Sequence, residues 1–308
     1  YEFSELTAHS FILLIGFEKG YTRLLELEKR ISKYGGALFY LSEIFGMEMI
    51  SPAFFEQTKS EFEEVYLHLQ DGLSREHFAA YLNSKINNDA RYCMDCRVNT
   101  ALYFDNDFLM LGDQEVVVDC GAYRGDTLDD CKKYLKNYRY YYAFEPDRDN
   151  YEILQARIEQ EGFRNTEAVN AGLYSTDTDL FFQSGRNMQS SIYSLSSGDV
   201  KDMNKGDAQT DMYRQRFVSL DHFLSEKKTG LCPTFLKIHA EGAELEVIGG
   251  ARTTIARYTP RIAVSCVHKK DDLITIYRRL KQLVPTYRFY FRIHRHLAVG
   301  AVLYCVHP

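Results

Sequence analysis

A glycine-bearing loop at residues 116–127, VVVDCGAYRGDT, carries residue types that suit a nucleotide-type cofactor. Its apolar run ends in Asp119, and Gly121 and Gly125 let the backbone turn tightly and approach a ligand closely. The next strand-like run, YYYAFEPD, reaches Glu145, 20 residues beyond Gly125. At this spacing an acidic side chain meets the ribose hydroxyls of an adenosine cofactor. Because a strand-to-helix turn with two glycines can also be purely structural, the prediction depends on the loop and Glu145 together.

The loop lacks the G-x-G-x-x-G spacing that places a pyrophosphate at a helix N-terminus in dinucleotide-binding proteins. Asp119 and Asp126 instead place negative charge where the phosphates would lie. Carboxylates suit S-adenosylmethionine, because this cofactor joins adenosine to a sulfonium and an α-amine. We therefore predict S-adenosylmethionine as the cofactor, bound by Asp119, Gly121, Ala122, Gly125, Asp126, Glu145, Pro146, Asn170 and Ala171.

Alternating strand and helix patterns from residue 115 onward predict the scaffold that positions these residues. The alternation is typical of a parallel sheet with helices on both faces. The last two apolar runs are joined by a short turn, so they must pair antiparallel. The expected strands are 115–119, 140–144, 167–171, 235–239, 261–267, 288–293 and 298–306.

Two regions of the chain depart from this alternation. Short apolar runs between residues 172 and 220 predict an inserted hairpin and a substrate loop at about 184–214. Residues 1–98 show helical periodicity, with helices expected at 21–34, around 62–69 and after Ser74, which we predict as an N-cap. We predict two domains, a helical N-terminal region at 1–98 and the cofactor-binding domain at 99–308.

Five segments of the chain resemble, in order, the motifs of the FkbM family of S-adenosylmethionine-dependent methyltransferases. They are VVVDCGAYRGDT, FEPD, FLKIHAEGAELEVIGGA (235–251), VHKKDDL (267–273) and VLYCV (302–306). The resemblance implies an α/β fold of the class I methyltransferase type, a Rossmann-like and mostly parallel sheet with an antiparallel last strand. It also implies O-methylation of a hydroxyl on a sugar, polysaccharide or related natural product.

Two positions differ from the family pattern. His239 stands where the family usually has Asp, in K-I-D-x-E-G, and Gly300 falls where an acidic residue usually precedes the last strand. Both changes remove a carboxylate from the expected catalytic face. The alternative is therefore a cofactor- or sugar-binding protein that keeps the fold but whose active site has changed and lost catalytic activity.

Candidate catalytic residues follow two strands at their carboxyl ends, where ligands bind in open α/β sheets. A hydroxyl acceptor must lose its proton as the methyl group arrives, and an imidazole with a pKa of about 6.5 can accept it. We predict His239 as the general base, Glu241 as the residue that orients it, and His268 as a further catalytic candidate. The structural alternatives are a hydrogen-bonded histidine at a strand end and a glutamate that caps the next helix.

We predict no metal site. Mg²⁺ requires hard oxygen ligands, and the changes at positions 239 and 300 remove carboxylates. Cys93 and Cys96 have the spacing of zinc ligands, but no second CxxC or nearby His pair accompanies them. A basic segment near the end of the chain is interpreted as a solvated strand edge in preference to a phosphate-binding surface. It contains Arg288, Arg292, His294, Arg295 and His296.

Composition restricts the partners and the location. The 308 residues carry a net charge of -6, with a pI of about 5.9, which disfavours a nucleic-acid partner. The longest apolar stretch near the start, residues 11–17, is far shorter than the about 20 residues that span a bilayer. Seven cysteines, an odd number, fit reduced thiols. We expect a cytoplasmic protein with a small-molecule or glycan acceptor and no membrane span, and the sequence does not indicate its oligomeric state.

Overall fold

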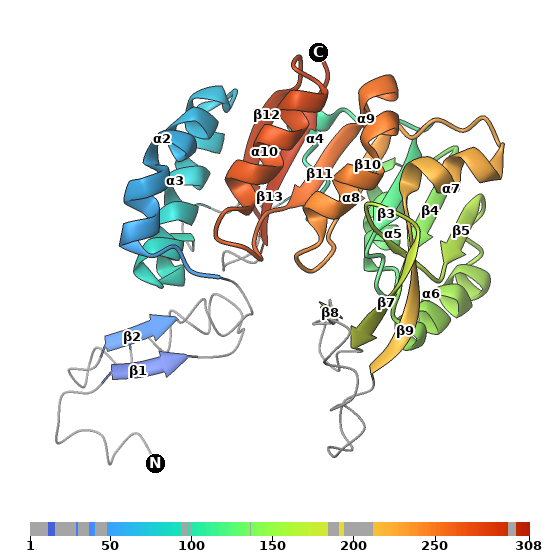
Figure 1. The fold of residues 1–308 in the computed structure, drawn as a ribbon, viewed down its shortest axis with the longest axis horizontal. Helices are drawn as coiled ribbons and strands as arrows, with labels where there is room; N and C mark the ends of the chain where they lie inside the picture. Colours follow the sequence, from blue (N-terminus) through green and yellow to red (C-terminus); the bar gives the residue numbers. More distant parts are fainter. Residues whose placement is uncertain are drawn as a thin grey trace. The chain divides into compact units, whose positions relative to one another are not determined.

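The structure is a computed structural model of the chain (Figure 1). It describes residues 12–15, 29, 37–40, 48–93, 96, 98, 100–135, 137–183, 191–193, 212–294 and 300–308. The chain divides into two compact units. The first comprises Tyr1–Leu102, Cys266–Ile274 and Tyr290–Val302, and the second comprises Tyr103–Ser265, Thr275–Phe289 and Leu303–Pro308. The first unit thus includes two segments from the C-terminal part of the chain, and the predicted boundary between 1–98 and 99–308 stays a prediction.

The N-terminal part of the first unit contains strands as well as helices. β1 (Ile12–Ile15) and β2 (Ala37–Tyr40) pair in parallel. The prediction of a wholly helical region is wrong here, because a short continuous apolar run cannot be assigned to helix or strand by its periodicity alone. The helix predicted at 21–34 lies outside the described residues, except for Lys29, which is helical.

Two capped helices follow in the first unit. α2 (Pro52–His68) begins after Ser51, whose hydroxyl accepts from the N–H of Phe54 (3.2 Å). α3 (Gly72–Asn87) begins after Asp71, whose carboxylate accepts from the N–H of Ser74 (2.6 Å). The prediction of Ser74 as the N-cap is therefore wrong, because the aspartate three residues earlier occupies that position. A short 3-10 helix, η3 (Ala90–Cys93), follows.

In the described residues, seven strands form the main sheet in the order β12-β13-β11-β10-β3-β4-β5. The pairs β11/β10, β10/β3, β3/β4 and β4/β5 are parallel. β12 and β13 are neighbours joined by residues 294–300 alone, a connection that suits only an antiparallel pair. The strands are β3 (Val116–Cys120), β4 (Tyr140–Phe144), β5 (Thr166–Val169), β10 (Phe235–Ile238), β11 (Arg261–Ser265), β12 (Arg288–Ile293) and β13 (Ala301–Val306).

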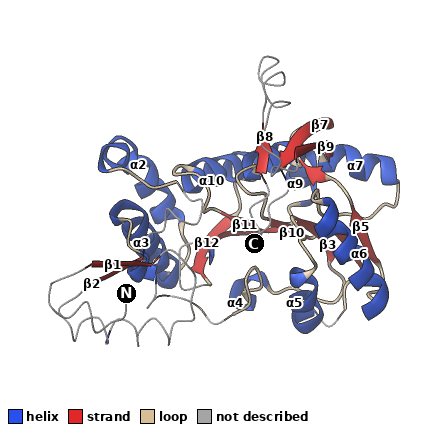
Figure 2. Ribbon diagram, turned by 90° about the horizontal axis from the view of Figure 1, so that it is seen from below, coloured by secondary structure: helices blue, strands red, loops and turns tan. Residues whose placement is uncertain are grey.

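Helices cover both faces of this sheet in the second unit. α5 (Asp126–Leu135) and α6 (Arg148–Glu161) lie on one face, and α7 (Leu220–Lys227) and α9 (Arg252–Tyr258) lie on the other (Figure 2). β3 and β10 are consequently buried along their whole length. The remaining helices are α4 (Asn106–Leu109), α8 (Glu244–Gly250) and α10 (Asp272–Leu283). None of the helices in the described part of the chain has the length and apolarity that a membrane crossing needs.

A smaller sheet is inserted between β5 and β10. Its strands are β6 (Gly172–Leu173), β7 (Thr178–Gln183), β8 (Ser191–Tyr193) and β9 (Met212–Val218), in the order β6-β9-β7-β8. β7 pairs antiparallel with both β8 and β9, and the consecutive pair β7/β8 corresponds to the predicted inserted hairpin. The substrate loop predicted at about 184–214 lies outside the described residues, apart from 191–193 and 212–214.

An ion pair with one deeply buried partner holds α3 against β12, which gives a first test. Nη2 of Arg292 lies 2.7 Å from Asp71, and only 3% of the arginine side chain is exposed, against 35% of the aspartate. Asp71→Ala leaves this guanidinium largely buried and also removes the cap of α3. We expect the free energy of unfolding, measured with urea, to fall by about 2–4 kcal/mol.

The matched control for that prediction is Asp129→Ala. Asp129 pairs with Arg157 at the surface (2.6 Å), where the two side chains are 51% and 27% exposed. Removing an exposed pair should cost less than about 1 kcal/mol. Equally small losses for both variants would show that burial of Arg292 does not increase the contribution of its ion pair to the free energy of unfolding.

Candidate active site

The loop between β3 and α5 meets two neighbouring strand ends. The backbone N–H groups of Gly121 and Ala122 donate to the carbonyl of Phe144, at the end of β4 (3.0 and 2.9 Å). Gly121 has a φ of +81°, and a Cβ there would lie 2.0 Å from the carbonyl oxygen of His239. Because backbone cannot give way like the end of a side chain, only glycine lets the loop approach the end of β10 so closely.

A buried ion pair lies next to this loop. Asp119 and Lys237 are partners in register on β3 and β10, with Oδ1 and Nζ 2.8 Å apart. Their relative exposures are 0% and 2%. Tyr141 donates to the other carboxylate oxygen (2.6 Å), and Nζ of Lys237 donates to the carbonyl of Gly121 (2.6 Å). The pair therefore ties the glycine loop to the two central strands.

The charge of Lys237 depends on this partner. Burial by itself lowers the pKa of the ammonium, but the Asp119 carboxylate outweighs burial and raises that pKa above the usual 10.5. Lys237 is absent from the residues predicted from the sequence. The signal that could have revealed it is a lysine inside the otherwise apolar strand FLKI, since a buried lysine needs an anionic partner. Asp119, predicted as a cofactor ligand, has both oxygens close to protein partners, and its direct contact with a cofactor stays a prediction.

Glu145 follows β4 and is buried beside the same loop. Its carboxylate oxygens accept from the backbone N–H groups of Tyr123 (2.7 Å) and Asp147 (2.9 Å). With 5% of the residue exposed, burial raises the pKa of this carboxyl from 4.5 to about 7. Each carboxylate oxygen has a second lone pair that can accept from a hydroxyl. Glu145 is thus held by the loop, and it changes protonation near neutral pH.

The other predicted cofactor residues differ in their surroundings. Nδ2 of Asn170 donates to the carbonyls of Glu145 (3.1 Å) and Pro146 (3.4 Å), so these three residues lie together. Asn170 and Ala171 also line a cleft of about 430 Å³ beside β5, β9 and α7. Asp126 is exposed in the first turn of α5. Their binding of a cofactor stays a prediction.

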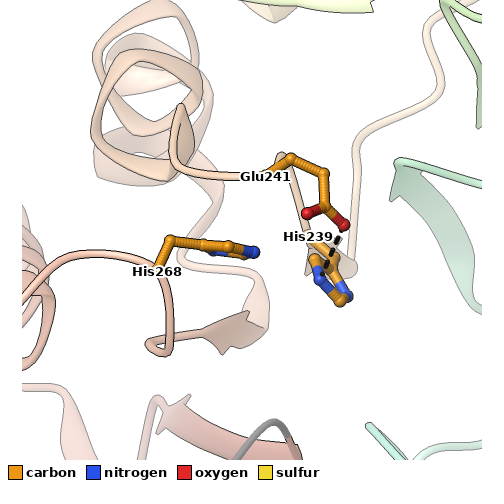
Figure 3. A group of neighbouring side chains, drawn as sticks. All are labelled: His239, Glu241 and His268. Atoms are coloured by element: carbon orange, nitrogen blue, oxygen red, sulfur yellow. Dashed lines mark ion pairs between the residues drawn. The ribbon is translucent and has the colours of Figure 1, made fainter. Parts of the chain in front are cut away.

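His239 lies just beyond β10, between a phenol and a carboxylate. Oη of Tyr103 is 2.6 Å from Nδ1, and Oε1 of Glu241 is 3.2 Å from Nε2. Figure 3 shows the Glu241 carboxylate directed at the imidazole. The structure therefore brings Glu241 to the ring that it was expected to orient. Tyr103 is not among the residues predicted from the sequence, because an isolated tyrosine ahead of the first sheet strand belongs to no motif.

The remaining catalytic and metal candidates belong to the first unit. His268 follows β11, its backbone carbonyl accepts from the N–H of Glu48 (2.8 Å), and its catalytic role stays a prediction. Burial raises the pKa of the Cys93 thiol to about 12. This disfavours the thiolate form that zinc requires.

The basic segment near the end of the chain is only partly solvated. Arg292 and His294 are 2% and 8% exposed, so the interpretation of these two residues as a solvated edge is wrong. The reason is that α3 packs there and supplies Asp71 as the partner of Arg292. Arg288 is exposed as expected, whereas Arg295 and His296 lie outside the described residues.

Comparison with known proteins decides the family. Residues 119–286, more than half of the chain, match the Methyltransferase FkbM domain. The chain belongs to the FkbM methyltransferase family. This family and its fold support a methyltransferase, and the predicted class I methyltransferase fold is confirmed.

One solved FkbM structure shares this fold. Methyltransferase FkbM from Methylobacillus flagellatus KT is similar with a TM-score of 0.72 and 20% identity, over 96% of this chain and 73% of that chain. Precorrin-6y C5,15-methyltransferase from Geobacter metallireducens GS-15 has a TM-score of 0.39 and 13% identity, over 65% of this chain and 84% of that chain. An rRNA methylase from Streptococcus thermophilus has a TM-score of 0.38 and 12% identity, over 65% and 92%. No curated protein matches the chain.

The contact between the FkbM glycine loop and β10 gives a second test. In Gly121→Ala the new Cβ meets the His239 carbonyl at 2.0 Å and also occupies a positive φ. We expect the variant to lose at least about 3 kcal/mol of unfolding free energy, because the backbone must shift in addition to adopting a strained φ. Chemical denaturation measures this loss.

Gly162→Ala separates the cost of the strained φ from the cost of the steric clash. Gly162 caps α6 at a φ of +67°, and a Cβ there would meet nothing within 4 Å. This control should lose only the about 1–2 kcal/mol that a left-handed conformation costs an L residue. If Gly121→Ala were no worse than Gly162→Ala, the close approach to His239 would have no energetic consequence.

Proposed function

We propose that this protein is an S-adenosylmethionine-dependent O-methyltransferase that acts on a hydroxyl of a sugar, polysaccharide or related natural product. The observation that carries the proposal is the FkbM match over residues 119–286, which includes both the glycine loop and Glu145. The bound cofactor would supply a methyl group activated by a sulfonium. The chain's own residues must hold that cofactor, orient the acceptor and accept its proton.

The residues at the loop fit such a cofactor. A buried carboxyl with a raised pKa needs hydrogen-bond donors to become charged, and the hydroxyls of a ribose are such donors. Glu145 lies against the loop through the N–H of Tyr123, so it would hold the ribose while Gly121 lets the loop backbone come close. The side-chain amide of Asn170 donates to the backbone carbonyl of Glu145 and so holds this segment in place.

The groups around His239 support a hydroxyl as the acceptor group. An alcohol is a weak nucleophile until its proton is accepted, and positioned general-base catalysis contributes about 10²- to 10⁴-fold. His239 and Glu241 supply an imidazole and a carboxylate at the carboxyl end of β10. Independence from metal ions stays a prediction. The cytoplasm stays the proposed location, and it agrees with the seven cysteines, all of which are free of disulfides.

Cofactor binding and turnover test the proposal in that order. S-adenosylhomocysteine at about a hundred times its Kd should add about 2.7 kcal/mol of stability, and NAD should add none. Mass spectrometry should then detect transfer from S-adenosylmethionine to one of a panel of methyl glycosides and nucleotide sugars. Binding without transfer to any acceptor would favour the alternative of a cofactor- or sugar-binding protein, and stabilisation by NAD alone would refute the proposed methyltransferase.

The protonation of Glu145 predicts how cofactor affinity depends on pH. Below about pH 7 the carboxyl is protonated in the free protein, and binding of ribose hydroxyls must displace that proton. We expect the affinity for S-adenosylhomocysteine to rise by up to about tenfold per pH unit as the pH increases towards 7, and to level off above 7, where the free carboxyl is already ionised. Isothermal titration calorimetry in buffers of different ionisation enthalpy should also detect proton release.

Two glutamine variants make this pH test specific. Glu145→Gln should bind more weakly and lose the pH dependence in this window. Glu167→Gln, on β5, removes a carboxylate that pairs with Lys227 and should keep the parent's pH dependence. An unaltered pH dependence in Glu145→Gln would show that a different group releases the proton.

A further inference from the structure

The phenol and the carboxylate beside His239 determine which ring nitrogen holds the proton. An ionised carboxylate can only accept a hydrogen bond, whereas a phenol can donate or accept. With a Glu241 carboxylate oxygen 3.2 Å from Nε2, the neutral ring is more stable with its proton on Nε2, because the other tautomer would place a nitrogen lone pair against the carboxylate. Nδ1 is then the basic nitrogen, and at 2.6 Å it accepts from the hydroxyl of Tyr103. The tautomer follows from these partners and not from observed hydrogens.

This arrangement makes the phenol the group that His239 activates. The lone pair of Nδ1 points at Tyr103, so the ring can take a proton from an acceptor directly only if that hydrogen bond breaks. A hydroxyl on one ring nitrogen and a carboxylate on the other is the arrangement by which an imidazole draws a proton from a hydroxyl. The proton of Tyr103 can pass to Nδ1 without any rearrangement of the three side chains.

Two further observations concern Tyr103 itself. Nζ of Lys237 lies 5.2 Å from the centroid of the Tyr103 ring, and this cation favours negative charge on the phenol as its proton leaves. Tyr103 also has a φ of +73°, a conformation that is uncommon for a residue other than glycine. Surrounding structure must hold the residue in this conformation, and such backbone strain concentrates at functional sites.

We propose that Tyr103 is the group that takes the proton from the acceptor hydroxyl, and that His239 and Glu241 are the residues that activate it. In this step the acceptor proton passes to Oη of Tyr103 while the phenol proton passes to Nδ1 of His239. The methyl carbon forms a bond to the acceptor oxygen, and the electrons of its bond to sulfur stay on sulfur. The positive charge of the sulfonium is replaced by that of the imidazolium, beside the Glu241 carboxylate.

The exposure of the three side chains suits the return to the starting state. Tyr103 is 5% exposed, while the side chains of His239 and Glu241 are 25% and 36% exposed. The imidazolium can release its Nε2 proton through Glu241, the most exposed of the three side chains, to water. The starting tautomer returns when Nε2 takes up a proton again and Nδ1 releases the one it received. This inference rests on the proposed O-methyl transfer, but the arrangement of Tyr103, His239 and Glu241 can be tested without it.

The test that needs no acceptor is an NMR experiment on the full chain labelled with ¹⁵N-histidine, with His239→Gln to assign the ring signals. At a pH where the ring is neutral, Nε2 should carry the proton and Nδ1 should show the shift of a hydrogen-bonded acceptor. In Tyr103→Phe the Nδ1 signal should move towards that of a free lone pair. A proton on Nδ1 of the neutral ring, or identical Nδ1 signals in both proteins, would overturn the proposal.

Kinetics with the acceptor found in the panel test the proton transfer itself. Tyr103→Phe should lose about 10²- to 10⁴-fold in rate, while its affinity for S-adenosylhomocysteine stays at the parent's value. His239→Ala should lose a similar factor, and the double variant should lose no more than the worse single variant, because residues that act as one unit are not additive. Tyr142→Phe is the matched control, since Tyr142 is fully buried and its hydroxyl faces Thr229 (3.5 Å).

The outcomes separate this proposal from the proposed function. A parent protein that transfers no methyl group counts against the proposed function, and the NMR experiment then decides whether Tyr103 donates to Nδ1 of His239. A parent that is active while Tyr103→Phe keeps the parent rate overturns the role of Tyr103. Losses that multiply in the double variant would show that Tyr103 and His239 act independently, which also overturns it.

Discussion

The ion pair between Lys237 and Asp119 is the interaction on which the candidate site depends. Two charges can be stable in a protein interior only when their geometry is good and their remaining hydrogen-bonding positions are filled. Here the two residues are register partners on adjacent parallel strands, and both are almost completely buried. Tyr141 donates to the carboxylate, and the ammonium donates to the carbonyl of Gly121. A break in this pair would leave one buried charge without compensation and would release the glycine loop from the central strands.

The same lysine links the two halves of the site. On the cofactor side it holds the carbonyl of Gly121, while the N–H of that glycine is held by β4 through Phe144. On the catalytic side its ammonium lies over the ring of Tyr103, whose hydroxyl meets His239. Since Gly121 also packs against the His239 backbone, the shape of the loop and the position of the imidazole cannot change independently. One buried cation therefore contacts both the loop proposed to bind the cofactor and the tyrosine proposed to take the acceptor proton.

Local patterns predicted most of the scaffold but not the contacts that complete the site. The apolar runs of β4 and β12 predicted these strands with their observed bounds, and the spacing from Gly125 led to Glu145, which does contact the loop. Lys237 could not be paired with Asp119, because the register of two strands far apart in sequence is a tertiary property. The backbone of Tyr103, with its positive φ, and its hydrogen bond to His239 leave no mark on residue spacing. The assignment of Arg292 to a solvated edge was wrong for the same reason, since its partner comes from α3.

Hydrogen exchange of the loop amides tests most directly whether the buried pair shapes the site. The variant should replace both charges, as in Lys237→Met with Asp119→Leu, because apolar substitution of a whole buried pair commonly preserves folding. Without the hydrogen bond from Lys237 to the Gly121 carbonyl, the amides of Gly121 and Ala122 should exchange at least about tenfold faster. The amides of β4 and β5 should keep the parent rate. Unchanged exchange at Gly121 and Ala122 in the folded double variant would contradict the account.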